Sequence, residues 1–168
     1  MDFKKLSDQY RDELLNNVLP FWLQNSQDKE FGGYFTCLDR EGKVFDTDKF
    51  IWLQGREVWM FSMLYNKVEK RQEWLDCAVQ GGEFLKKYGH DGNYNWYFSL
   101  DRSGRPLVEP YNIFSYTFAT MAFGQLSLAT GNQEYADIAR KTFDIILSKV
   151  DNPKGKWNKL HLGTRNLK

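Results

Sequence analysis

The sequence has few residues of the kinds that build metal sites, disulfide frameworks or polyanion-binding surfaces. Only 2 cysteines and 2 histidines occur in 168 residues, and Cys37 and Cys77 have neither CxxC nor Cys/His metal spacing. The formal net charge is +1, with the basic residues spread along the chain, so we expect no nucleic-acid partner. Both thiols are expected to be inert, buried or half-buried side chains.

Long apolar segments are also missing. No stretch approaches the roughly 20 apolar residues that a membrane-spanning helix needs. The first residues, MDFKKLSDQYRDELL, contain acidic side chains and no apolar run of the length found in signal peptides. We therefore expect a cytoplasmic protein with no membrane partner, and the length is typical of one domain.

Aromatic residues, in contrast, are abundant: 13 Phe, 9 Tyr and 6 Trp. Such a density suits either a large helical core or a cleft in which rings stack on sugars, and composition does not separate the two. The positions of the aromatic residues along the chain must distinguish between these two uses.

The segment FIWLQGREVWMFSMLY, residues 50–65, is helix-length and apolar on nearly every side, which is typical of a buried helix. Arg56 interrupts it. Helical spacing predicts one face made of Trp52, Arg56, Trp59 and Met63. We expect Arg56 to project between two indoles into a polar, aromatic-walled cavity. The alternative is a structural ion pair with Glu57 or Glu109.

An internal repeat organises the chain. The residues LDREGK, 38–43, return as LDRSGR, 100–105, which is 62 residues later. At this offset Trp52 corresponds to Phe114 and Trp59 to Met121, and an offset of 61 takes Ala78 to Ala139. The repeating unit is therefore a β-hairpin, an inner helix and an outer helix.

The predicted elements follow from this unit. An amphipathic helix over 3–24 has an apolar residue at every fourth position, and Pro20 kinks its end or starts a second short turn. Hairpins are expected at 34–45 and 94–108, and helices at 50–65, 72–87, 112–129 and 134–149. Gly131-Asn132 should end the third of these helices. The residues expected to be buried on the last helix are Tyr135, Ile138, Ala139, Phe143, Ile146 and Leu147.

Repeats that cannot bury both faces alone must stack on neighbours. The predicted fold class is therefore all-α: a partial (α/α)6 toroid of about five helices, with small β-hairpins on one rim. A closed toroid of six helical pairs needs more helices than this, so residues 1–150 are interpreted as the N-terminal part of a barrel. Residues 151–168, basic and glycine-containing, are expected to form a loop or tail.

The segments GGYFTCLDREGKVFDTDKFIWLQGREVWMFSMLY, 32–65, and PYNIFSYTFATMAFGQLSLATGNQEYADIARKTFD, 110–144, resemble the N-acylglucosamine 2-epimerase family. The resemblance covers essentially the whole chain and implies an (α/α)6 barrel of more than twice this length. It implies interconversion of N-acetylglucosamine and N-acetylmannosamine by proton transfer at C2, with no metal required.

Epimerisation next to a carbonyl needs an acid and a base on opposite faces of the carbon. The resemblance implies a pair of histidines for this work, placed beyond Lys168. His90 and His161 are predicted in a turn and in the terminal loop, in exposed or capping roles. We therefore expect the chain alone to be inactive.

The resemblance also assigns residues that bind the substrate. Arg56 matches an arginine that contacts the sugar oxygens, and Phe118 an aromatic residue that lines the same pocket, although plain core packing explains Phe118 equally well. Ser115 and Tyr111 are further candidates at the rim of the pocket.

The tail GKWNKLHLGTRNLK, 155–168, is similar to a loop by which some family members bind ATP as an activator. The candidate phosphate-binding residues are Lys156, Lys159, Thr164 and Arg165. The alternative is an ordinary solvated basic loop.

Two other functions stay open at this point. One is a carbohydrate-binding or regulatory module without catalysis. The other is an interaction protein whose open barrel edge pairs with another subunit, as in a homodimer, since large apolar patches usually mark association.

Overall fold

The computed structural model describes residues 1–110 and 113–150. A long N-terminal helix consists of α1 (Phe3–Glu13), a π-helical turn (Leu14–Val18) and α2 (Leu19–Asn25). Two helical pairs follow, α3 (Ile51–Lys67) with α4 (Gln72–Tyr88), and α5 (Phe114–Thr130) with α6 (Gln133–Ser148). In the described residues the helices thus have the order and the boundaries, within two residues, that the repeat predicts. The tail, 151–168, lies outside the described residues.

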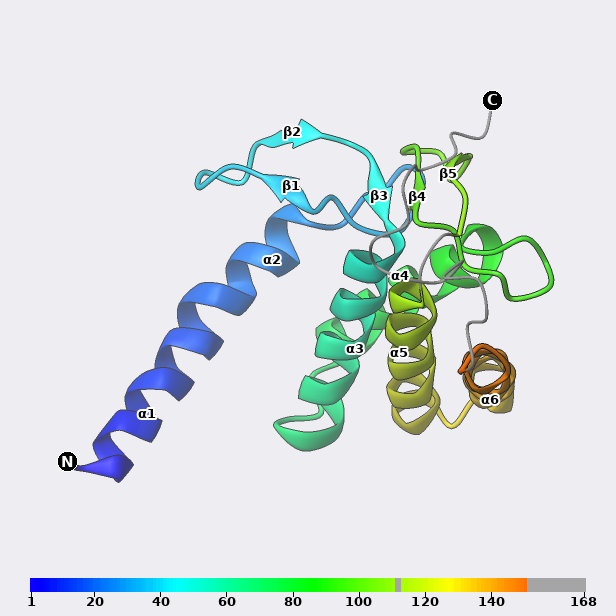
Figure 1. The fold of residues 1–168 in the computed structure, drawn as a ribbon. Helices are drawn as coiled ribbons and strands as arrows, with labels where there is room; N and C mark the ends of the chain where they lie inside the picture. The colour runs from blue at the N-terminus through cyan, green and yellow to red at the C-terminus, as the bar shows by residue number, and fades with distance from the viewer. Residues whose placement is uncertain (111–112, 151–168) are drawn as a thin grey trace.

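The short strands lie together at one end of α3 and α5 (Figure 1). Strands β1 (Cys37–Leu38) and β2 (Val44–Asp46) form an antiparallel hairpin. Strand β3 (Lys49–Phe50) joins β4 (Ser99–Leu100) and β5 (Pro106–Val108) in a three-stranded antiparallel sheet of order β3-β4-β5. Both hairpins were predicted. The pairing of β3 with β4, which ties the two repeats together, was not.

The two hairpin turns have the same geometry, which confirms the repeat in three dimensions. In the first, the Gly42 N–H donates to the Asp39 carbonyl over 3.1 Å, and in the second the Gly104 N–H donates to the Asp101 carbonyl over the same distance. Both glycines have a positive φ, 86° and 96°, a conformation that residues with a Cβ rarely adopt.

The core lies where α3 packs between α4 and α5, with α6 on the far side of α5 (Figure 1). Ile51, Val58 and Phe61 of α3 are fully buried there, as are Ala119 and Phe123 of α5. This arrangement agrees with two inner helices, α3 and α5, each followed by an outer helix. The predicted end of α5 is also confirmed, since Gly131 is left-handed at its C-terminus.

The N-terminal helix forms as predicted but extends away from the rest of the molecule (Figure 1). Apolar residues do recur at every fourth position, but α1 contains no buried residue, and Tyr10 is 70% exposed. The π-helical turn ends at Val18, two residues before Pro20. Proline has no N–H and its ring clashes with a carbonyl one turn back, so a wider turn accommodates it without breaking the helix.

One prediction about α6 is wrong. Phe143 and Leu147 are 49% and 53% exposed, whereas Thr142 is fully buried and accepts a hydrogen bond from the indole of Trp96 over 3.1 Å. The buried face of α6 therefore includes Thr142 in place of Phe143. A buried hydroxyl that has a hydrogen-bond partner is as acceptable in the core as an apolar group. Tyr135, Ile138 and Ala139 are buried as expected.

Candidate functional site

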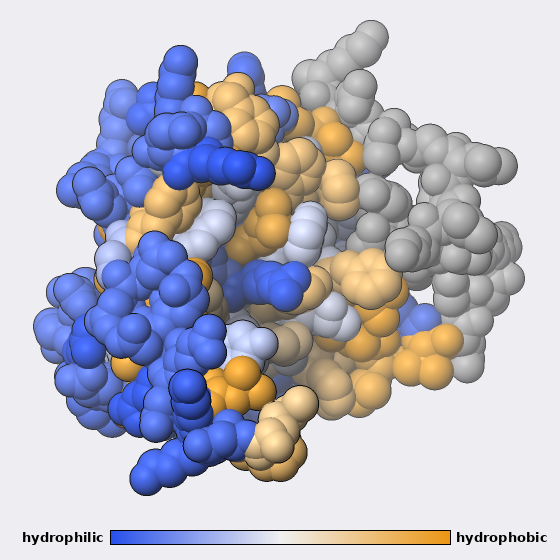
Figure 2. All heavy atoms as spheres, turned by 90° about the vertical axis from the view of Figure 1, so that its left-hand side faces the viewer, coloured by the Kyte–Doolittle hydropathy of each residue, from blue (hydrophilic) through white to orange (hydrophobic). Residues whose placement is uncertain are grey.

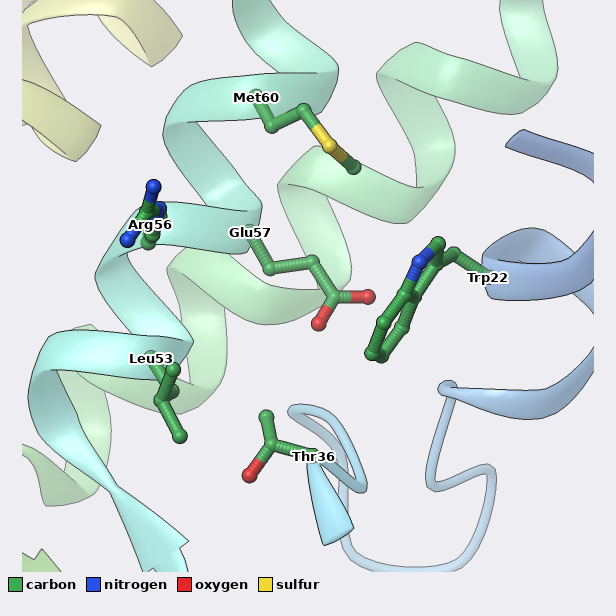
Figure 3. A pocket seen from close by; sticks show the side chains of 6 residues that line it. All are labelled: Trp22, Thr36, Leu53, Arg56, Glu57 and Met60. Carbon is green, nitrogen blue, oxygen red and sulfur yellow. The ribbon is translucent and has the colours of Figure 1, made fainter. Parts of the chain in front are cut away.

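A hollow of about 290 Å³ lies between α2 and the middle of α3. Positions 53, 56, 57 and 60 of α3 form one side, since residues three and four apart share a helix face. The opposite side comes from α2 and from the segment before β1. The lining residues are Trp22, Thr36, Leu53, Arg56, Glu57 and Met60 (Figure 3).

Arg56 supplies the positive charge of this hollow. Its side chain is exposed and forms no hydrogen bond or ion pair with any residue in the described part of the chain. Figure 3 shows the guanidinium directed away from the Glu57 carboxyl. Neither Glu57 nor Glu109 pairs with Arg56 within the described residues, so the ion pair considered as the alternative is not formed. An unpaired guanidinium with five donors can bind carboxylates, phosphates or sugar hydroxyls.

The aromatic wall of the hollow differs from the prediction. Trp52 and Trp59 are half-buried and do not line it. The indole that lines it is Trp22, which comes from α2. The error arises because helical spacing reports only which residues share a face of one helix, whereas the wall facing that helix comes from another element.

Glu57 occupies the base of the hollow as a buried carboxyl group. Its side chain points toward α2 (Figure 3) and hydrogen-bonds to the Ser26 hydroxyl. Burial raises the pKa of Glu57 to about 8, against the opposing effect of the Ser26 hydrogen bond.

The hydrogen bonds around Ser26 independently favour a protonated Glu57. The Ser26 hydroxyl lies 2.6 Å from the Trp22 carbonyl oxygen, which can only accept. A hydroxyl has one proton, so it cannot donate to this carbonyl and to a carboxylate together. A protonated Glu57 that donates to Ser26 satisfies both contacts. The lining of the hollow therefore includes the charged guanidinium of Arg56 and the neutral carboxyl group of Glu57.

The remaining candidate residues lie on α5 or outside the described residues. The Phe118 ring packs at 5.9 Å from the Trp52 ring, and Phe118 does not line the hollow. Ser115 is buried. Tyr111 and the tail residues Lys156, Lys159, Thr164 and Arg165 are outside the described residues, as is His161. The structure thus brings none of the described candidates into the hollow except Arg56.

His90 has a structural role in the turn after α4, as predicted. Its Nδ1 accepts the Gly92 N–H over 3.0 Å, and its ring stacks on Tyr94 at 4.8 Å. The imidazole is half-buried rather than exposed, and this burial lowers its pKa. It takes no part in the hollow.

A buried ion network holds the loops next to the site, and nothing in the sequence pattern indicated it. Asp28 and Lys49 form an ion pair of 3.0 Å with both side chains at 0% exposure. Arg102 from the second hairpin also binds Asp28, over 2.9 Å. Burial alone would raise the pKa of Asp28, but the hydrogen bonds from Arg102 and Lys49 outweigh it and lower the pKa to about 2.

The sequence pattern of the N-acylglucosamine 2-epimerase (GlcNAc 2-epimerase) family matches residues 33–166, a span that includes α3 and its arginine. The chain belongs to this family. N-acylglucosamine 2-epimerase of Mus musculus is 44% identical over 146 residues, which cover 84% of this chain and 35% of the mouse protein. The resemblance inferred from the two segments is therefore confirmed.

Solved structures of epimerases have the same fold. Cellobiose 2-epimerase from Bacillus thermoamylovorans B4167 superimposes with a TM-score of 0.77 at 28% identity, over 86% of this chain and 37% of that enzyme. A sugar epimerase from a ruminal bacterium gives a TM-score of 0.78 at 28% identity, over 84% of this chain and 36% of its own. These neighbours are (α/α)6 barrels, which confirms the partial toroid. The chain spans only about a third of the length of these family members.

In the part of the chain that the structure describes, no helix is both long enough and apolar enough to cross a membrane.

Proposed function

We propose that this chain forms the N-terminal part of an N-acyl-D-glucosamine 2-epimerase, which interconverts N-acetylglucosamine and N-acetylmannosamine in the cytoplasm. The observation that carries the proposal is Arg56, an unpaired guanidinium on an inner helix beside a sugar-sized hollow, in a chain 44% identical to an N-acylglucosamine 2-epimerase. The cellobiose 2-epimerases are less similar, at 28% identity for the enzyme of Dictyoglomus turgidum, and this favours the amino sugar.

The chemistry assigned to the chain is binding and orientation. The Arg56 guanidinium donates to the oxygens of the sugar and stabilises negative charge that develops on them during proton removal at C2. Trp22 offers an indole surface for the apolar face of the ring.

The proton transfer itself needs an acid and a base on opposite sides of C2. Glu57 does not suit either role, because its carboxyl group is buried and already hydrogen-bonded to Ser26. In this proposal a histidine pair outside residues 1–168 supplies both groups, so the chain alone binds sugar weakly and does not turn it over. No cofactor is required, and ATP bound by Lys156, Lys159, Thr164 and Arg165 acts as an activator.

Titration calorimetry of the chain with N-acetylglucosamine and N-acetylmannosamine tests the role of Arg56. We expect weak binding that falls tenfold or more in Arg56→Ala, since a hydrogen bond to a charged group contributes about 1.5–3 kcal/mol. Arg140→Ala is the matched control, because Arg140 is an exposed arginine on α6 whose ion-pair partner is Asp137. Equal binding by all three proteins would contradict the proposal.

A non-catalytic carbohydrate-binding module is the second candidate, because Arg56 and Trp22 need no catalytic group to hold a sugar. Tight binding by the chain alone, insensitive to the rest of an epimerase, would favour that function.

A further inference from the structure

The hollow beside Arg56 contains a second polar group, which the proposed epimerase chemistry does not use. Glu57 is only 7% exposed, yet its side chain lines the hollow. Its Oε1 hydrogen-bonds to the Ser26 hydroxyl. In the part of the chain that the structure describes, no residue donates a hydrogen bond to its Oε2 or forms an ion pair with the carboxyl group. One oxygen of a nearly buried side chain is therefore left for a molecule that enters the hollow.

The hydrogen bonds around Ser26 determine what this oxygen can do. The Ser26 hydroxyl donates its one proton to the Trp22 carbonyl, so Glu57 carries a proton on Oε1 and donates it to Ser26. Oε2 is then the carbonyl oxygen of a neutral acid, which accepts hydrogen bonds. Figure 3 shows one carboxyl oxygen on the side of Trp22 and the other on the side of Thr36. Glu57 thus offers the hollow an uncharged hydrogen-bond acceptor.

Apolar side chains flank this acceptor. Leu53 and Met60 are four residues before and three residues after Glu57, so the three share one face of α3. The Trp22 indole from α2 lies across the hollow from them (Figure 3). Figure 2, which views the molecule from the side of α1, shows hydrophobic side chains exposed beside hydrophilic ones over the middle of this face. A group that fits next to Glu57 must combine a hydrogen-bond donor with apolar surface.

Three common substituents at C2 of a hexose meet this requirement differently. An acylamino group has an N–H donor and an apolar methyl, so it satisfies the acceptor and covers the flanking side chains. A hydroxyl group can donate to the acceptor but leaves the apolar surface uncovered. A free amino group is an ammonium ion below about pH 7, which a neutral Glu57 does not neutralise and which the fixed charge of Arg56 repels. The surroundings of Glu57 therefore favour the acylamino group.

We propose that Glu57 is a specificity-determining residue for the acyl group of a 2-acylamino sugar. Its Oε2 accepts a hydrogen bond from the amide N–H, and the acyl methyl packs against Leu53 and Met60. Arg56 binds the sugar oxygens elsewhere in the hollow, in keeping with a guanidinium directed away from the Glu57 carboxyl group (Figure 3). The assignment rests on the proposed function, because it concerns the same hollow and the same class of substrate. It gives Glu57 a role in selecting the substrate and none in proton transfer.

Saturation-transfer NMR of the chain with N-acetylglucosamine, glucose and glucosamine tests this assignment. At about pH 6, Glu57 is neutral, since its pKa is raised to about 8, and glucosamine is positively charged. We expect N-acetylglucosamine to bind about tenfold more tightly than glucose, and its acetyl methyl to receive the strongest saturation transfer. Glucosamine should bind more weakly than glucose.

Two substitutions separate the hydrogen bond of Glu57 from its shape. Glu57→Gln keeps an uncharged acceptor and should preserve the preference for N-acetylglucosamine over glucose. Glu57→Met has a similar volume but no acceptor, and should reduce this preference about three- to tenfold. Glu41→Met is the matched control, because Glu41 is exposed and does not line the hollow. Circular dichroism verifies that the variants are folded. If Glu57→Met does not fold, the wild-type order of the three sugars and the methyl contact still decide the question.

The outcomes distinguish this assignment from the proposed function. A preference that Glu57→Gln keeps and Glu57→Met loses supports the assignment, even if Arg56→Ala binds N-acetylglucosamine as well as the wild type does; the proposed role of Arg56 then fails alone. Binding that depends on Arg56 but shows no preference over glucose, or a preference unchanged in Glu57→Met, overturns the assignment and leaves the proposed function in place. Absence of binding by all three sugars overturns both.

Discussion

The Asp28 carboxylate lies 3.0 Å from the Lys49 ammonium group, with both side chains wholly removed from solvent. The ammonium group also donates to the carbonyl oxygens of Gly32 and Arg102, over 2.6 and 2.8 Å, so its three N–H donors are satisfied. Burial lowers the pKa of Lys49, while Asp28 opposes this effect. This pair joins the first loop, β3 and the second hairpin.

Asp28→Asn should destabilise the fold by about 3–5 kcal/mol, because it leaves the buried Lys49 charge without its counterion. Urea denaturation at pH 7 measures the difference. The control is Asp39→Asn, a half-buried turn residue with a similar backbone-capping role. Equal stability of Asp28→Asn and the wild type would show that the pair contributes nothing.

The same pair predicts sensitivity to acid. The pKa of Asp28 is lowered from 3.8 to about 2, so between these values the unfolded chain binds more protons than the native one. The stabilisation, on the order of 2 kcal/mol, is complete above about pH 4 and is lost as the pH falls toward 2. Denaturation from pH 5 to pH 2 should therefore show a steeper decline for the wild type than for Asp28→Asn; parallel declines would refute this.

Glu57→Gln should stabilise the protein at alkaline pH. The pKa of Glu57 is raised from 4.5 to about 8, so between these values the native state binds the additional proton and stability falls as the pH rises. The loss between pH 5 and pH 8 is about 3–4 kcal/mol for the wild type and should be absent in Glu57→Gln, which is neutral throughout. Thermal melts at both pH values measure it, with the exposed Glu41→Gln as control. A wild type whose pH dependence matches that of Glu57→Gln would indicate an ionised Glu57.

Gly81→Ala should destabilise the core through a single methyl group. A Cβ at Gly81 would lie 2.2 Å from the hydroxyl of the buried Tyr34, which donates to the Cys77 carbonyl over 2.7 Å. Such overpacking costs about 1–3 kcal/mol. Gly124→Ala provides the contrast, because nothing lies within 4 Å of its Cβ and alanine favours a helix by about 0.5–1 kcal/mol. The two variants should shift the melting temperature in opposite directions, and shifts of the same sign would contradict this packing.

The sequence predicted the elements well because both repeat units carry the same local signals. Turn residues such as Gly42 and Gly104, and the apolar spacing of α4 and α6, act over a few neighbouring residues. The candidate site was predicted less completely. Arg56 stood out as a charge in an apolar helix, whereas Trp22 reaches the hollow only through the packing of α2 on α3.

The buried polar pairs were missed for a related reason. Ser26 and Glu57 are 31 residues apart in sequence, and Asp28 and Arg102 are 74 apart. No periodic pattern encodes such contacts. The first depends on how the end of α2 packs beside α3, and the second on how loops from the two repeats meet in space.

The central claim is that this chain supplies the arginine of an epimerase pocket that the rest of a barrel completes. The most direct measurement is a coupled assay of N-acetylmannosamine formation from N-acetylglucosamine by three samples. They are a complex of the 168-residue chain co-expressed with the portion of the mouse epimerase that follows its matched 146 residues, the 168-residue chain alone, and the complex carrying Arg56→Ala. We predict turnover by the complex, none by the chain alone, and a loss of about 100-fold in the variant, the typical cost of removing one donor that stabilises developing charge. Turnover by the isolated chain, or an Arg56→Ala complex as active as the wild type, would contradict the claim.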